Sequence, residues 1–102
     1  MIENLDNLVL MLTSEDVEIR KLAENYLNKN YDLNFNFYVG ISYKTHKRTF
    51  ELDNNEFKSN NCYYKLYVKD FMDNIIDYPN LWNNDEIYDL INIILKYNES
   101  LK

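Results

Sequence analysis

The sequence contains little glycine, proline or cysteine, with one residue of each among 102. With Gly40 alone, the chain holds neither the glycine-rich loop that binds nucleotide phosphates nor the dinucleotide-binding fingerprint, because both motifs need several glycines within a short stretch. With Cys62 alone, no internal disulfide can form, which predicts a reducing compartment and most simply the cytoplasm. No apolar run approaches the roughly 18–20 residues of a membrane-spanning helix, so we expect no membrane partner.

Histidine and positive charge are also scarce. The one histidine, His46, has no cysteine, histidine or carboxylate at ligand spacing and no nucleophile nearby, so we predict neither a metal site nor a catalytic dyad. Cys62 lies beside tyrosines and is expected to be a packed thiol rather than a nucleophile. Seventeen acidic against eleven basic residues give a net charge of −6, which disfavours a general nucleic-acid binder. The sequence therefore predicts no catalytic residue and no cofactor.

Two helices are predicted at the start of the chain. Residues 1–12 carry apolar side chains at helical spacing, and a second helix is expected after a capping box in which Thr13 is the N-cap and Asp16 reaches back to it. Arg20 is expected on a polar face of this second helix. Its packed face is expected to consist of Ile19, Leu22, Ala23, Tyr26 and Leu27.

The same region carries a recognisable pattern, in which a leucine, an acidic turn and an apolar–arginine pair precede an alanine and a leucine on the packed face. Those positions are filled by Leu12, Asp16, Ile19, Arg20, Ala23 and Leu27. From Leu12 to Leu27 the chain thus resembles a single HEAT or armadillo-type helical repeat unit, and no second copy follows. The resemblance implies a helical hairpin and, as in that family, a protein-binding surface without catalytic residues.

A β-hairpin is predicted in the middle of the chain. Apolar and small or polar residues alternate from Phe35 to Tyr43, and residues 49–53 continue the alternation, which is the pattern of half-buried strands. We predict that Lys44 pairs with Thr49, which leaves a four-residue loop from Thr45 to Arg48. The same register places Ile41 opposite Leu52. Because an isolated hairpin is marginally stable in water, helices are expected to cover its apolar face.

Two further helices are predicted after the hairpin. Apolar spacing predicts one from about Asn60 to Asp77, with a third strand over Cys62–Val68 as the alternative. Asn83 and Glu86 form a capping box for the last helix. Its packed face is expected to hold Ile87, Leu90, Ile91, Ile94 and Leu95.

The predicted fold is therefore α+β, with all 102 residues in a single small domain. Two N-terminal helices precede a central antiparallel β-hairpin, at about Phe35–Asp53, and two C-terminal helices pack around it.

Charged residues gather at three places. Lys44, His46, Lys47 and Arg48 fall within five residues at the hairpin tip. This tip is expected to contact a partner, although basic residues also serve to keep a turn soluble and to protect strand edges. The two acidic sets are predicted to be solvated helix faces. The alternatives are a joint negative strip, a cation site, a surface that imitates nucleic-acid phosphates, and a catalytic carboxylate pair. The two sets are Asp70, Asp73 and Asp77, and Asp85, Glu86 and Asp89.

The sequence as a whole predicts a small, acidic, non-enzymatic protein that binds another protein through Lys44, His46, Lys47 and Arg48 and an adjoining helical surface. Many tyrosines and a single alanine reflect AT-rich codons, which fit an AT-rich bacterium, its phage or an AT-rich eukaryotic microbe equally well. A short, acidic chain of this composition suits a phage or mobile-element inhibitor, accessory protein or adaptor. Nucleic-acid contact through the basic tip is the first alternative, and a small hydrolase that uses Asp70, Asp73 and Asp77 is the second. A homo-oligomer formed by strand pairing is left open.

Overall fold

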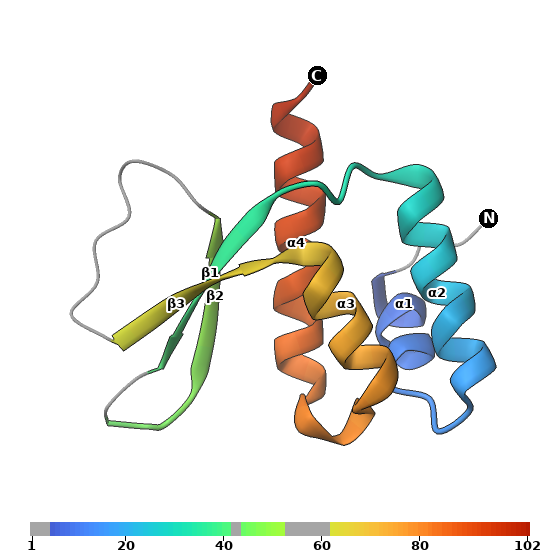
Figure 1. Ribbon diagram of the computed structural model, residues 1–102, viewed down its shortest axis with the longest axis horizontal. Helices are drawn as coiled ribbons and strands as arrows, with labels where there is room; N and C mark the ends of the chain where they lie inside the picture. Colours follow the sequence, from blue (N-terminus) through green and yellow to red (C-terminus); the bar gives the residue numbers. More distant parts are fainter. Residues whose placement is uncertain (1–4, 42–43, 53–61) are drawn as a thin grey trace.

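The structure, a computed structural model, describes residues 5–41, 44–52 and 62–102. Within these residues, four α-helices and a three-stranded antiparallel sheet form the predicted α+β fold (Figure 1), so the fold class is confirmed. In chain order the elements are α1 (Leu5–Leu12), α2 (Val17–Asn30), β1 (Asn36–Ile41), β2 (Arg48–Leu52), β3 (Cys62–Tyr67), α3 (Val68–Asp77), the short 3-10 helix η1 (Pro79–Leu81) and α4 (Asn84–Ser100). The parts of the predicted elements that fall on residues 1–4, 42–43 and 53–61 lie outside the described residues.

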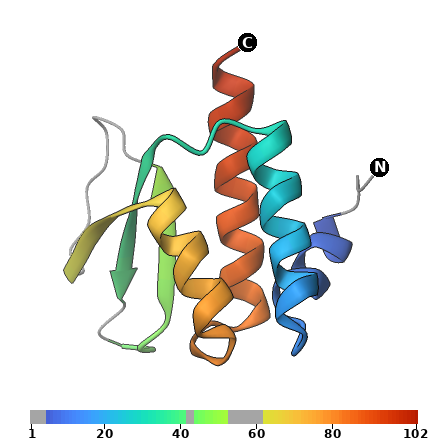
Figure 2. The ribbon, with the colours of Figure 1, turned by 45° about the vertical axis from the view of Figure 1, so that its right-hand side comes forward.

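The elements form layers. Figure 2 shows α3 and α4 next to the sheet, with α1 and α2 on the side away from it. Helix α4 is the centre of the arrangement, since it packs against both β2 and α1. Its face is buried as predicted at Ile87, Leu90, Ile91 and Ile94, while Leu95 is half-buried. No helix in the described part of the chain is long and apolar enough to cross a membrane.

Strand β1 lies at the centre of the sheet, because β2 pairs with one of its edges and β3 with the other. The prediction of a helix beginning at about Asn60 is wrong over Cys62–Tyr67, where the alternative of a third strand is correct. In the β1–β3 pairing, Leu66 lies opposite Phe37. Strand β3 thus forms hydrogen bonds with the edge of β1 that β2 does not occupy. Tertiary pairing of this kind outweighs a local helical pattern.

The predicted hairpin register is wrong by four residues. Thr49 lies opposite Gly40 rather than Lys44, and Ile41 lies opposite Arg48 rather than Leu52. Because the shift is an even number, the same side chains still point at the helices. The observed register lets Phe50 pack edge-on against Phe37 and Phe71, each at 5.4 Å between ring centroids. Arg48 is consequently the first residue of a strand and not part of the loop.

Helix α2 begins later and faces differently than predicted. Its N-cap is Asp16, whose carboxylate accepts a hydrogen bond from the backbone N–H of Glu18 at 2.9 Å, so the predicted N-cap at Thr13 is wrong. Ile19 and Leu22, which were predicted to pack, are 37% and 58% exposed. Ile19 and Leu22 therefore lie outside the packed face, whereas Ala23 and Leu27 are buried as predicted.

Arg20 was predicted to lie on a polar face of α2, but it is buried, with 7% of its surface exposed. Its Nε donates to the backbone oxygen of Ile76 at 3.0 Å, and its Nη1 donates to that of Ser14 at 2.7 Å. The guanidinium thus binds the last turn of α3, where the helix dipole favours positive charge. These hydrogen bonds offset the cost of burying the polar group, and they fix the rotation of α2 that exposes Ile19.

Candidate functional site

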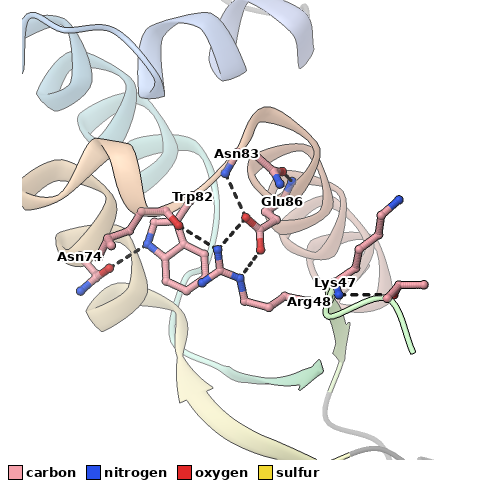
Figure 3. A network of polar contacts seen from close by, with 8 residues as sticks. Lys47, Arg48, Asn74, Trp82, Asn83 and Glu86 are labelled. Carbon is pink, nitrogen blue, oxygen red and sulfur yellow. Dashed lines mark hydrogen bonds and ion pairs between the residues drawn. The ribbon is translucent and has the colours of Figure 1, made fainter. Parts of the chain in front are cut away.

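Arg48, directly after the hairpin tip (residues 44–47), joins the hairpin to the first turn of α4 (Figure 3). Arg48 donates from Nε and Nη2 to the two carboxylate oxygens of Glu86, and the Nη2–Oε1 distance is 2.9 Å. The same Nη2 donates to the backbone oxygen of Leu81 at 2.8 Å. Forked pairing of this kind is among the stronger side-chain interactions. We call it the Arg48–Glu86 clamp.

The capping box of α4 holds Glu86 in place for the clamp. The Asn83 side chain accepts the backbone N–H of Glu86 at 2.9 Å, and the Glu86 carboxylate accepts the backbone N–H of Asn83 at 3.0 Å. The predicted capping box is therefore confirmed. Glu86 is 5% exposed, and the N-terminus of the helix stabilises its negative charge together with Arg48.

Trp82 connects the clamp to the core. The guanidinium carbon of Arg48 lies 4.0 Å from the centroid of the indole ring, which is a cation–π contact. The indole N–H donates to the Asn74 side-chain oxygen at 2.8 Å, as Figure 3 shows. The indole ring also packs against Phe71 and Phe50, with distances between ring centroids of 4.5 Å and 6.2 Å. Movement of the tip relative to α3 and α4 therefore requires the loss of several contacts at once.

A cleft of about 360 Å³ lies between the hairpin tip and α4, and we call it the tip cleft. Its lining contains charges of both signs, because Lys47 and Arg48 of the hairpin border it together with Asp85 and Asp89 of α4. Burial, followed by the nearby charges of Asp85 and Glu86, raises the pKa of Asp89 above its ordinary value. The lining consists of His46, Lys47, Arg48 and Thr49 from the hairpin and Asn83, Asp85, Glu86 and Asp89 from α4.

The predicted contact residues separate into two groups. Lys44, His46 and Lys47 are exposed, whereas the side chain of Arg48 is 31% exposed and is engaged in the clamp. His46 has a φ of 57°, in the left-handed region, which histidine tolerates better than most residues. The backbone N–H of Lys47 donates to the Thr45 hydroxyl at 3.3 Å, which tightens the turn.

The two predicted acidic sets face different neighbours. Asp85, Glu86 and Asp89 border the tip cleft, whereas Asp73 contacts Glu24 of α2. Burial raises the pKa of Glu24, and so do Asp73 and Asp77, while Lys21 acts in the opposite direction. Within residues 5–41, 44–52 and 62–102, no three histidine, cysteine, aspartate or glutamate side chains are grouped so as to hold a metal ion.

Sequence reasoning missed the clamp. Glu86 and Trp82 were each recognisable from local signals, because one completes a capping box and the other precedes it. Nothing in the sequence connects them to Arg48, which lies 38 residues before Glu86. The one available signal for their pairing was charge, because the hairpin tip is basic and the start of the last helix is acidic.

In comparisons with known proteins, the chain gives no significant match to a family model, to a curated protein or to a solved structure. Its geometry is therefore the basis for the function proposed below.

Proposed function

We propose that the chain is a non-enzymatic protein-binding protein that contacts its partner through the tip cleft and the exposed hairpin tip. The observation that carries this proposal is the Arg48–Glu86 clamp, which joins the hairpin to α4 where His46 and Lys47 line one cleft with Asp85 and Asp89. A surface that is held in place before binding loses less conformational entropy when a partner docks. Charges at such a surface mainly set the association rate and the choice of partner.

The balance of charge favours a protein partner over nucleic acid. Lys44, Lys47 and Arg48 supply three positive charges, and Asp85, Glu86 and Asp89 supply three negative ones, so the surface is neutral overall. The whole chain carries −6. A nucleic-acid backbone presents one sign of charge and gains affinity from each phosphate that is neutralised. A protein surface with both signs complements this arrangement better.

The cellular context is part of the same proposal. The single Cys62 supports a place in the cytoplasm, and a short, acidic chain whose residues have AT-rich codons suits a phage or mobile-element inhibitor, accessory protein or adaptor. The resemblance of Leu12–Leu27 to a HEAT or armadillo-type unit adds support for protein binding, since such units present binding surfaces in that family.

The proposal is tested by quantitative affinity capture from a lysate of the native host. We expect a protein that is captured by the wild type and is reduced about tenfold with Lys44→Ala/Lys47→Ala, which corresponds to a loss of about 1.4 kcal/mol. The matched control is Lys29→Ala/Lys102→Ala, which removes two exposed lysines elsewhere and is expected to leave capture unchanged. Equal capture by all three proteins would contradict the proposal.

Nucleic-acid contact is the second candidate, because Lys44, His46 and Lys47 are exposed. It predicts binding to DNA or RNA that weakens steeply as salt increases and that disappears in the Lys44→Ala/Lys47→Ala variant. Absence of binding at low salt would end this alternative.

A further inference from the structure

A second hollow lies on the other side of the Trp82 region, between β3 and α3. Its volume is about 320 Å³, at the small end of the roughly 300–1,000 Å³ range of ligand sites. Its surface is mostly apolar, and two polar side chains one turn apart on α3, Asp70 and Asn74, complete the lining. The whole lining consists of Leu66, Asp70, Phe71, Asn74 and Trp82. We call it the Trp82 hollow.

The carboxylate of Asp70 lines the Trp82 hollow, and an exposed acidic row continues from it along α3. Asp70, Asp73 and Asp77 are exposed on α3, on the face opposite its buried Val68, Phe71, Met72, Ile75 and Ile76. At 1.5 Å of rise per residue this acidic row is roughly 10 Å long. Glu24 of α2 contacts Asp73, and burial, followed by the nearby carboxylates of Asp73 and Asp77, raises the pKa of Glu24. Like charges held this close together destabilise the free protein, and a cationic partner relieves that repulsion.

The occupant must therefore combine a positive charge with apolar surface. Arginine does so, because its stem covers apolar side chains and its guanidinium pairs with carboxylates through two parallel hydrogen bonds. Because the Arg48 guanidinium already stacks on this indole, 4.0 Å from its centroid, Asp70 is the group in the lining with which a second guanidinium would pair. The Asn74–Trp82 hydrogen bond holds the ring in a fixed orientation at the wall of the hollow. Lysine offers a compact ammonium without the planar fork and fits less well.

We propose that the Trp82 hollow binds an arginine side chain from a basic segment of a partner protein, with Asp70 pairing with the guanidinium and Asp73 and Asp77 facing further cationic residues of that segment. Leu66 and Phe71 contact the apolar stem of the arginine. This surface is separate from the tip cleft, so the chain carries two binding surfaces, one on each side of the Arg48–Trp82 stack.

Trp82 is the only tryptophan and reports directly on occupancy of the hollow. The probe is a short, aromatic-free, arginine-rich peptide, titrated into the intact chain at about 150 mM salt, where the Debye length is about 8 Å. We expect a saturable change in tryptophan emission. The same peptide is expected to bind less tightly with lysine in place of arginine and not at all with uncharged citrulline.

The variant Asp70→Asn is expected to raise the dissociation constant about threefold to fivefold, in keeping with an exposed ion pair of up to about 1 kcal/mol. Glu99→Gln makes the same charge change at an exposed residue of α4 that does not line the hollow, and it is expected to leave the dissociation constant unchanged. Lys44→Ala/Lys47→Ala is also expected to bind the peptide normally, so this test and the test of the tip cleft fail independently.

Four results would overturn the proposal. They are unchanged tryptophan emission, equal weakening by Asp70→Asn and Glu99→Gln, loss of peptide binding in Lys44→Ala/Lys47→Ala, and binding of free arginine amide as tightly as the peptide. The last result would identify a small cation rather than a protein segment as the ligand.

Discussion

Replacement of Arg48 by methionine is expected to lower the free energy of unfolding by about 2–3 kcal/mol. The loss has two parts, because the Glu86 carboxylate is buried at 5% exposure and Arg48 also stacks on Trp82. Without Arg48, the Glu86 carboxylate keeps the Asn83 N–H and the helix N-terminus as its partners among the described residues. Loss of one partner from a buried ion pair costs roughly 3–5 kcal/mol, and the 31% exposure of Arg48 reduces that figure.

A double-mutant cycle measures the clamp itself. Glu86→Gln alone is expected to cost about 1–2 kcal/mol, because the amide keeps an acceptor for Asn83 but loses the charge. The double variant Arg48→Met/Glu86→Gln is expected to be more stable than the sum of the two single losses predicts, by about 1–2 kcal/mol. Urea denaturation followed by far-UV circular dichroism provides the four free energies.

The control for this cycle is Lys47→Met, an exposed neighbour of Arg48 at the same tip. Its cost is expected to stay within about 0.5 kcal/mol, as for most surface substitutions. A coupling energy below about 0.5 kcal/mol would refute the role of the Arg48–Glu86 clamp in stability. So would a decrease in the free energy of unfolding that is as large for Lys47→Met as for Arg48→Met.

Two other predictions concern stability. Because the pKa of Glu24 is raised in the folded protein, its contribution to the free energy of unfolding is complete below the ordinary pKa of 4.5 and is lost as pH rises through the raised pKa. Glu24→Gln should therefore become more stable relative to the wild type as pH increases, as measured by urea titrations. A difference in stability that stays constant with pH would contradict this. Arg20→Met is expected to cost about 2–3 kcal/mol because the backbone oxygens of Ile76 and Ser14 lose their donor, whereas Lys21→Met should change little; equal thermal midpoints for the two variants would contradict the role of Arg20.

The sequence predicted those features that depend on local pattern. Period-two alternation identified Phe37, Val39 and Phe50 as inward-facing, and all three are buried. The capping box of Asn83 and Glu86 was equally readable, because both partners lie within one helical turn. Hairpin register depends on turn geometry and on packing with other elements, so an error of four residues left the inward face intact and still misplaced Arg48.

Features that depend on distant contacts were not predictable. Whether Ile19 or its neighbour Arg20 is buried depends on a small rotation of α2, and backbone oxygens of Ser14 and Ile76 decide it. Strand β3 forms because the edge of β1 is available for pairing, and the residues of Cys62–Val68 alone left a third strand as the alternative to a helix. The basic tip was recognised, but its pairing with the acidic start of α4 required the three-dimensional arrangement.

Site-specific photo-crosslinking in cells of the native host tests the central claim most directly, namely that the tip cleft contacts a protein. A photoreactive amino acid is placed at Lys47 in the tip cleft, and in a control protein at Lys102 at the end of the chain. The account predicts a discrete protein adduct from position 47 that is missing from position 102. Adducts with nucleic acid, the same adduct from both positions, or no adduct from position 47 would contradict it.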